Sequence, residues 1–222
     1  MHAIRLRSAV IECKWLQMIL CCLIVIDAFD RVQFVFIPKR KWLPMPYTEK
    51  KIDHTLVDRE TINAFVKRLA EEISRDFSGK ELYFICVLKG SFMFMADLVR
   101  EIDLPCEVDF MSVKSYEGEK STGVVKINKD LDRSIAGKHV LIVEDIVDTG
   151  LTLNHLKALL STRNPASISI VTAFDKPMRR RVDIHVDYVG MEIPNEFIVG
   201  YGLDLDGFYR NLPEVVVLSD KE

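Results

Sequence analysis

The sequence predicts an α/β fold: a mostly parallel, twisted sheet flanked by helices. The chain has 222 residues, of which 49% are apolar and 28% charged, a composition typical of an ordinary globular protein with a sizeable core. Apolar runs of strand length recur along it, and segments with helical spacing of apolar residues lie between several of them. This order favours parallel strands, because parallel neighbours need a long crossover connection, usually a helix.

The first helix is predicted to begin after Asp58, a residue type favoured at helix N-caps. Apolar residues follow at positions 62, 65, 66, 69 and 73, which is the spacing of one helix face. The Ser78-Gly79 pair is a stop signal, so we expect an amphipathic helix that ends near it.

A buried strand, a second helix and further short strands are predicted next. The nearly unbroken apolar run 82–88 is typical of a strand covered on both faces, and residues 92–102 have helical spacing. A third helix is expected after Thr152, and further strands at 108–113, 140–143, 168–173, 188–189 and 197–199. Because ligands of such sheets bind beyond the carboxyl ends of the strands, we expect the chemistry in the loops that follow them.

The first 44 residues differ in character from the rest. Nine apolar residues at 18–26 follow several basic residues and end at Asp27. The run is shorter than the roughly 20 residues of a membrane span. It would suit the centre of a secretory signal, but no A-x-A-like cleavage site follows. A buried strand or helix segment is a further reading, and a translation start at Met45 is the one we favour. Residues 45–222 then form the domain, and residues 1–44 an N-terminal extension, either an upstream start or a targeting segment.

Charge and cysteine content restrict the partners and the compartment. The net charge is −3, so the chain has no general electrostatic reason to bind nucleic acid or anionic lipid, and no stable membrane association is expected. Five cysteines are an odd number with no C-x-x-C pair, which indicates a reducing compartment and hence a cytoplasmic protein. Cys86 lies within the apolar run 82–88, where we expect a buried thiol.

Residues 144–152 are the most informative segment of the chain. Glu144, Asp145 and Asp148 follow the apolar run 140–143 directly, and three carboxylates at one strand end favour contact with water, a cation or the hydroxyl groups of a ligand. The small residues that come next suit a phosphate, because a turn that opens a helix exposes backbone N–H groups. The segment thus favours a phosphorylated polyol as ligand, although a helix cap beside solvated carboxylates would have the same composition.

The stretch VLIVEDIVDTGLTL at 140–153 resembles the 5-phosphoribosyl-1-diphosphate (PRPP) binding motif of the type I phosphoribosyltransferases. The resemblance continues in order over residues 45–222 and is closest to the 6-oxopurine branch, the hypoxanthine-guanine phosphoribosyltransferases. It implies the fold of that family, with a small hood region beside the sheet.

The resemblance assigns roles to the residues of this motif. Glu144 and Asp145 would hold the ribose hydroxyls, directly or through Mg²⁺. The 5′-phosphate would be wrapped by Asp148, Thr149, Gly150, Leu151 and Thr152. Asp148 would also accept the proton at purine N7, as the catalytic residue. Leu151 stands where some relatives have Lys, a departure of little expected effect because backbone amides do most of the phosphate binding.

The remaining roles also rest on the resemblance, because each residue taken alone is a common loop, surface or core residue. Pyrophosphate would be bound by Lys89, Gly90 and Arg210, and Asp204 would help to hold a second Mg²⁺. Ser115 and Tyr116 would begin a mobile lid that excludes water. In the purine site Lys176 would donate to the 6-oxo group, Phe197 would stack on the base, and Ile198 would contact the edge of the base through its backbone.

The implied activity is purine salvage: PRPP and hypoxanthine or guanine give IMP or GMP and pyrophosphate, with Mg²⁺. A non-catalytic PRPP or nucleotide sensor with the same fold is the alternative, and another base such as xanthine is a third reading. Sensors with this fold usually add a basic surface or a DNA-binding domain, neither of which the composition indicates. The family also implies a homo-oligomer, either a dimer or a tetramer.

Overall fold

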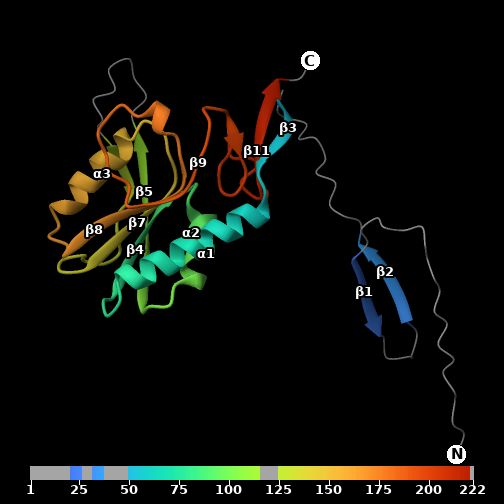
Figure 1. Cartoon of the computed structure of the whole chain (residues 1–222), viewed down its shortest axis with the longest axis horizontal. Coiled ribbons are helices and arrows are strands. Elements are labelled where there is room, and N and C mark those ends of the chain that lie inside the picture. Colours follow the sequence, from blue (N-terminus) through green and yellow to red (C-terminus); the bar gives the residue numbers. More distant parts are fainter. Residues whose placement is uncertain (1–20, 27–31, 38–49, 116–124, 221–222) are drawn as a thin grey trace, which may run out of the picture. The chain divides into compact units, whose positions relative to one another are not determined.

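The computed structural model describes residues 21–26, 32–37, 50–115 and 125–220 (Figure 1). The chain divides into two compact units, Met1–Thr48 and Glu49–Glu222. In the first unit β1 (Cys21–Ile26) pairs with β2 (Val32–Ile37) as an antiparallel hairpin. Of the readings of the apolar run at 18–26, the structure therefore supports a strand for its last six residues. The proposed start at Met45 lies outside the described residues.

The second unit is built on a six-stranded sheet with the order β6-β5-β4-β7-β8-β9. Its strands are β4 (Leu82–Leu88), β5 (Cys106–Ser115), β6 (Val125–Lys129), β7 (His139–Val147), β8 (Ser167–Asp175) and β9 (Tyr188–Glu192). All neighbours are parallel except β5 and β6. The prediction of a mostly parallel α/β sheet is confirmed.

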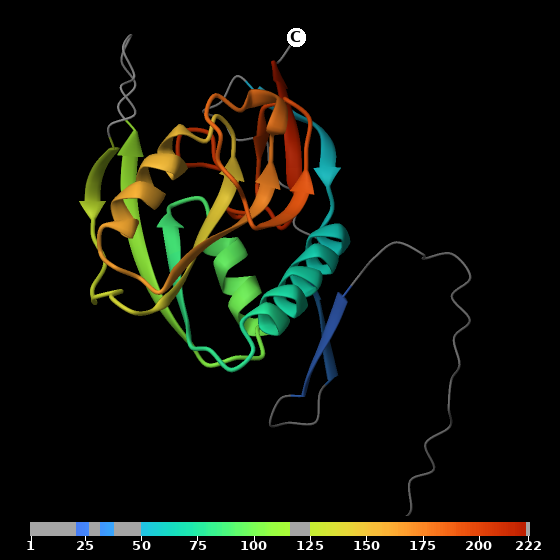
Figure 2. The same ribbon diagram turned by 60° about the vertical axis from the view of Figure 1, so that its left-hand side comes forward.

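Helices cover both faces of this sheet (Figures 1 and 2). α1 (Arg59–Asp76) and α2 (Phe92–Glu101) share one apolar cluster with Phe84 and Cys86 of β4. α3 (Leu151–Ser161) shares the other cluster with Tyr83 and Ile85 of the same strand. Successive side chains of a strand point to opposite faces, so burial on both sides explains the unbroken apolar run.

The first helix follows its sequence signals closely. Asp58 is the N-cap of α1, and its side chain accepts a hydrogen bond of 2.8 Å from the backbone N–H of Thr61. The apolar residues at 62, 65, 66, 69 and 73 are all buried, as their spacing predicts. Cys86 is a buried free thiol, which confirms the expectation for it. No helix in the described part of the chain is long and apolar enough to cross a membrane.

A separate three-stranded sheet has the order β10-β11-β3 and corresponds to the expected hood region. It contains β3 (Lys50–Val57), β10 (Ile198–Val199) and β11 (Val215–Asp220), which pair antiparallel. The strand predicted at 197–199 thus belongs to this sheet and not to the parallel one. β3 is exposed along most of its length, so it lacks the apolar pattern of a strand, and it forms only by pairing with distant residues.

Four strands of the main sheet, β5, β7, β8 and β9, are longer than predicted, and the extension of β7 changes where the acidic residues lie. β7 extends to Val147 because it pairs with β8 as far as Val147 and Asp175. Glu144 and Asp145 are therefore strand residues, whereas we predicted that they lie in the loop after the strand. The third helix likewise begins at Leu151, one residue before Thr152.

Candidate active site

Several of the predicted site residues lie at the carboxyl ends of three adjacent strands, β4, β7 and β8. Lys89 and Gly90 follow β4, where the peptide between Leu88 and Lys89 is cis. Glu144 and Asp145 lie near the end of β7, Asp148 follows it, and Lys176 comes directly after β8. Parallel pairing brings these ends to one edge of the sheet, which is where ligands bind in open α/β folds.

Glu144 and Asp145 form a half-buried pair of carboxylates. Burial, and then the neighbouring charge of Asp145, raises the pKa of Glu144 well above its ordinary value. Burial also raises the pKa of Asp145, against the effect of its hydrogen bond from the backbone N–H of Ile146 at 2.8 Å. Two carboxylates that resist ionising together favour a cation or hydroxyl donors as their ligand.

Glycine lets the loop after β4 approach this pair. A Cβ on Gly90 would lie 1.4 Å from Oδ2 of Asp145, so any other residue here would force the Asp145 side chain to move. The backbone that is predicted to bind pyrophosphate therefore lies directly beside a predicted ribose and metal ligand. Among the described residues no group of three or more His, Cys, Asp or Glu side chains is arranged to hold a metal ion.

The start of α3 has no side-chain cap that would compete with a ligand for its backbone N–H groups. Gly150 occupies the N-cap position with φ of +79°, and it provides no side-chain cap. The contact of the Leu151 N–H with Oγ1 of Thr149 is long, at 3.5 Å. α1, in contrast, is capped by Asp58. The first N–H groups of α3, including that of Thr152, lie at the positive end of the helix dipole and suit a phosphate.

Asp148 is held by two consecutive arginines that the sequence analysis did not consider. Arg179 binds its carboxylate at two points, Nε to Oδ1 at 2.7 Å and Nη2 to Oδ2 at 3.2 Å. Arg180 donates through Nη1 to the carbonyl of Asp148 at 2.7 Å and to that of Val147 at 3.1 Å. The run Arg179-Arg180-Arg181 is the signal that could have identified them, since it places three cations after β8, beside the acidic end of β7.

The predicted purine ligands lie on two neighbouring segments. Lys176 is buried, and its Nζ donates to the carbonyl of Glu196 at 2.7 Å. Burial lowers the pKa of Lys176, while the charge of Asp148 acts in the opposite direction. Phe197 follows Glu196 and is 52% exposed, which is unusual for phenylalanine and leaves a ring face free to stack on a base. Ile198 is buried within β10.

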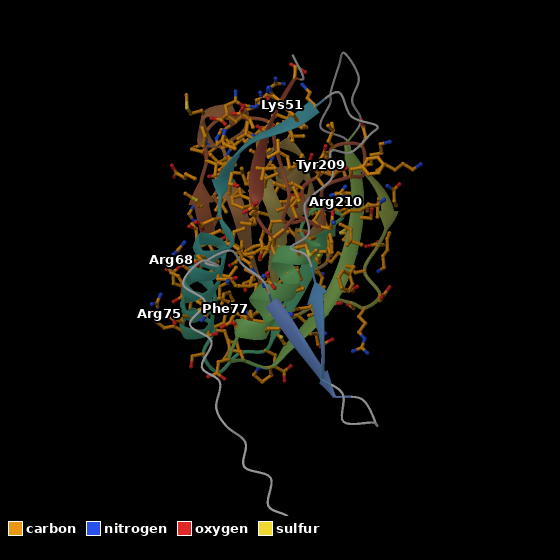
Figure 3. The ribbon with its side chains drawn as sticks, turned by 90° about the vertical axis from the view of Figure 1, so that its right-hand side faces the viewer. Lys51, Arg68, Arg75, Phe77, Tyr209 and Arg210 are labelled. Carbon is orange, nitrogen blue, oxygen red and sulfur yellow. The ribbon has the colours of Figure 1, made fainter. Side chains whose placement is uncertain are left out.

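The loop that links β10 to β11 carries Asp204, the predicted ligand of a second Mg²⁺, and Arg210, the predicted pyrophosphate ligand. Figure 3 shows Arg210 in this loop. Asp204 and Arg210 form an ion pair of 2.6 Å between Nη2 and Oδ1, and Arg210 also donates to the carbonyl of Gly202 at 2.6 Å. The backbone N–H of Gly207 donates to Oδ2 of Asp204 at 2.7 Å. Burial still raises the pKa of Asp145, but the positive charge of Arg210 opposes that rise, as expected if this loop lies near the acidic pair.

The predicted lid begins at the carboxyl end of β5, a strand that pairs in parallel with β4 as far as Ser112 and Leu88. Ser115 is the last residue of β5, and Tyr116 lies outside the described residues.

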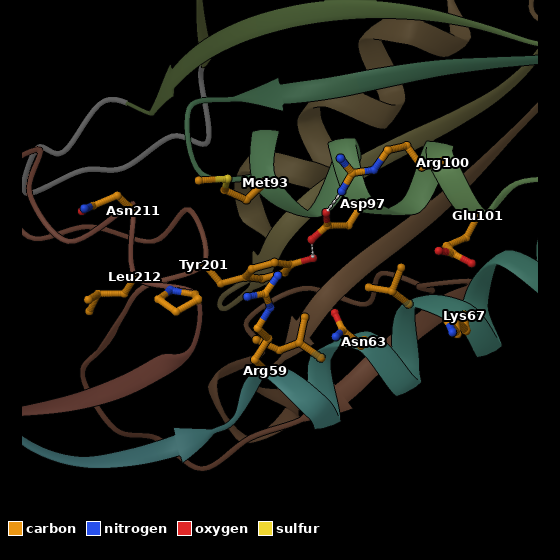
Figure 4. A pocket seen from close by; sticks show the side chains of 13 residues that line it. Arg59, Asn63, Lys67, Met93, Asp97, Arg100, Glu101, Tyr201, Asn211 and Leu212 are labelled. Carbon is orange, nitrogen blue, oxygen red and sulfur yellow. Dashed lines mark hydrogen bonds and ion pairs between the residues drawn. The ribbon is translucent and has the colours of Figure 1, made fainter. Parts of the chain in front are cut away.

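A separate cavity of about 440 Å³ lies between α1, α2 and the segment 201–213 (Figure 4). Asp97 accepts a hydrogen bond of 2.9 Å from the hydroxyl of Tyr201 and forms an ion pair with Arg100. None of the predicted site residues lines this cavity.

Known proteins match the chain over most of its length. A family model described as a phosphoribosyl transferase domain matches residues 55–206. The hypoxanthine-guanine phosphoribosyltransferase of Streptococcus thermophilus is 48% identical over 174 residues, 78% of this chain and 97% of that protein.

Solved structures of hypoxanthine-guanine and hypoxanthine phosphoribosyltransferases also match the chain. A hypoxanthine-guanine phosphoribosyltransferase from Bacillus anthracis has a TM-score of 0.74 and 48% identity, and covers 77% of this chain and 99% of its own. A hypoxanthine phosphoribosyltransferase from Staphylococcus aureus has the same TM-score and identity over 76% and 92% of the two chains. The chain therefore belongs to the type I phosphoribosyltransferase family, in its hypoxanthine-guanine branch.

Proposed function

We propose that the chain transfers the 5-phosphoribosyl group of PRPP to hypoxanthine or guanine, giving IMP or GMP and pyrophosphate. The observation that carries this is one edge of the sheet, where the Glu144–Asp145 pair lies at the end of β7 and the uncapped start of α3 follows it. The carboxylate pair suits ribose hydroxyls, and the helix start suits the 5′-phosphate. The chain is also 48% identical to proteins named for this activity.

Catalysis would rest on charge and position. The ribosyl carbon gains positive charge as its bond to pyrophosphate breaks, and the carboxylates of Glu144, Asp145 and Asp148 stabilise that charge. Arg210 and Lys89 offset the negative charge of the leaving pyrophosphate. On the base, Asp148 accepts the proton at N7.

The purine would be chosen by Lys176 and Phe197. An ammonium has three donors and no acceptor, so Lys176 can keep its bond to the Glu196 carbonyl and donate another to a 6-oxo group, but it cannot accept from a 6-amino group. Phe197 would stack on the base, and Ile198 would contact its edge through the backbone. A lid that begins at Ser115 and Tyr116 would exclude water from the ribosyl centre.

Mg²⁺ fits the acidic pair as a cofactor. Two half-buried carboxylates that repel each other are partial ligands for a hard cation, and Mg²⁺ is usually bound by one or two carboxylates together with substrate oxygens. Glu144 and Asp145 would hold one ion, and Asp204 would help to hold a second ion on the diphosphate side. When bound, Mg²⁺ supplies positive charge that stabilises the diphosphate as a leaving group.

The test is PRPP-dependent nucleotide formation with hypoxanthine, guanine, xanthine and adenine. We expect turnover with one or both of the first two. Turnover with none of the four would favour a non-catalytic PRPP or nucleotide sensor. A preference for adenine would contradict the role of Lys176, and a preference for xanthine would change the substrate assignment.

Four further parts of the proposal need separate tests. We propose residues 45–222 as the phosphoribosyltransferase domain and Met45 as the start, which the intact mass of the natively expressed protein tests. We propose a cytoplasmic location, which cell fractionation tests. Light scattering tests a dimer or tetramer. Electrophoretic mobility shift tests the expectation that nucleic acid is not bound.

A further inference from the structure

We propose that Arg179 is a positioning residue for the transfer reaction: its guanidinium fixes the orientation in which the Asp148 carboxylate faces the purine. The inference rests on the proposed function, in which Asp148 accepts the proton at N7. Nothing in the sequence resemblance assigned a role to Arg179.

The geometry of the pair supports orientation. Nε and Nη2 of Arg179 bind one oxygen each of Asp148, at 2.7 and 3.2 Å. Two parallel bonds from a planar guanidinium fix the plane of a carboxylate as well as its position, which a single point charge does not do. Each oxygen keeps a further lone pair, so the carboxylate held in this way can still accept a proton from a base.

Arg179 is itself fixed relative to Asp148. The short helix η1 (Pro177–Arg179) follows Lys176, and the N–H of Arg179 donates to the carbonyl of Lys176 at 3.0 Å. Arg180 binds the carbonyls of Val147 and Asp148, and the N–H of Arg181 donates to the carbonyl of Thr149 at 3.0 Å. One turn of chain therefore carries both the proposed ligand of the 6-oxo group and the residue that orients the proton acceptor.

Stability alone does not account for this pair. The side chains of Arg179 and Asp148 are 43% and 42% exposed. Ion pairs with that exposure contribute little to folding, because water screens them and two side chains lose freedom. We therefore expect loss of the pair to affect the reaction and to leave the fold intact.

The experiment is a double-variant cycle of Arg179→Gln and Asp148→Asn, followed by single-turnover nucleotide formation from PRPP and hypoxanthine. Arg179→Gln is expected to slow the single-turnover rate about tenfold, and by less than about twofold when Asp148 is already Asn, since coupled residues are not additive. Arg179→Lys should recover little of the rate, because it keeps the charge and loses the two-point bond. The KM for PRPP should change by less than about twofold, because uniform binding is unaffected.

Arg163→Gln is the matched control. Arg163 binds Asp130 at two points, 2.7 and 2.9 Å, just beyond the C-terminal end of α3 and so away from the helix start. Its loss should leave the rate unchanged. Three results would overturn the proposal: no effect of Arg179→Gln, an equal effect in both backgrounds, or full activity with Arg179→Lys.

A crystal structure of the variant tests the positioning role of Arg179 independently of the proposed function. In crystals of the Arg179→Gln variant without ligand, the Asp148 carboxylate should occupy a different rotamer or several, while Arg163→Gln leaves it in place. An unchanged Asp148 would overturn the positioning role even if the wild-type protein turned over none of the bases. If Asp148 does move in the Arg179→Gln variant but the wild-type protein turns over none of the bases, the result contradicts the proposed function and not the positioning role.

Discussion

Gly202 lies against Gly90 so closely that a Cβ on Gly202 would be 1.9 Å from the carbonyl oxygen of Gly90. Gly202 also has φ of +99°, a conformation that residues with side chains rarely adopt. The two glycines belong to the two loops proposed to bind the diphosphate, one after β4 and one between β10 and β11. Their contact fixes the distance between those loops.

Replacing Gly202 with Ala should therefore damage both the fold and the site. We expect the free energy of unfolding to fall by about 3 kcal/mol, since strain at positive φ adds to a clash with backbone that cannot move cheaply. Pyrophosphate affinity should fall as the loops separate. Urea denaturation measures the first effect, and calorimetry with pyrophosphate and Mg²⁺ measures the second.

Gly137→Ala is the control, because Gly137 has φ of +74° but nothing lies within 4 Å of a Cβ there. It should lose only about 1 kcal/mol from the conformation itself. Equal losses in the two variants would show that the approach to Gly90 has no energetic consequence.

The sequence alone predicted the parallel core because its signals are local. Residues 82–88 are apolar on both faces, and the helix after Asp58 has its cap and its apolar spacing within one short segment. The predicted ligands on β4, β7 and β8 met at one edge because parallel strands align their carboxyl ends.

What the sequence could not predict depends on pairing between distant residues. β3 is mostly exposed and is a strand only because β11 lies beside it. β7 continues through two carboxylates, which no strand pattern indicates, because β8 pairs with it that far. The run of three arginines marks a cluster of cations, but the contacts of Arg179 and Arg180 with Asp148 form only on folding, because Asp148 lies 31 and 32 residues earlier in the chain.

The acidic pair should cost stability at neutral pH. The pKa of Glu144 is raised in the folded protein, mainly by burial and then by Asp145, so the folded state binds this proton more tightly than the unfolded chain does. Its contribution to stability is complete below the ordinary value of 4.5 and is lost as the pH rises through the raised pKa. Glu144→Gln should thus raise the melting temperature at pH 7.5, and the gain should shrink toward pH 5 in calorimetric scans.

Glu107 provides a control of opposite sign. Its hydrogen bond of 2.6 Å from Lys138 lowers its pKa, so its contribution is present above its ordinary pKa and lost as the pH falls. Glu107→Gln should lower the melting temperature at pH 7.5. A gain for Glu144→Gln that does not depend on pH would contradict the burial argument.

Phe197 should contribute to purine binding and little to folding. Its ring is 52% exposed, so Phe197→Ala removes little buried surface. Stacking on a base is worth about 1–3 kcal/mol, which predicts a KM for hypoxanthine raised about tenfold with PRPP affinity unchanged. Steady-state kinetics with each substrate varied in turn would measure this.

Phe110→Ala tests whether any exposed ring has this effect. Phe110 is 39% exposed on β5, five residues before the end of that strand. Its loss should leave the KM for hypoxanthine unchanged. A similar rise in both variants, or none in Phe197→Ala, would remove Phe197 from the purine site.

Arg180 should be needed for the fold of the loop after β7. Its side chain is 18% exposed and forms an ion pair with Asp175, which is 10% exposed. It also donates to the carbonyl of Val147, the last residue of β7, and to that of Asp148 in the loop. Arg180→Met leaves Asp175 buried without its partner, and breaking such a pair typically costs about 3 kcal/mol or more. Urea denaturation should show this loss.

Two comparisons distinguish this cost from the general effect of losing an arginine. Arg163→Gln breaks a more exposed pair, 28% and 49%, and should cost less than about 1 kcal/mol. Replacing Asp175 with Leu in the Arg180→Met background should restore part of the stability, because it removes the uncompensated buried charge. The contrary outcome is that Asp175→Leu lowers the free energy of unfolding by the same amount in the Arg180→Met background as in the wild-type protein. Asp175 would then be held independently of Arg180, and the loop after β7 would not depend on this pair.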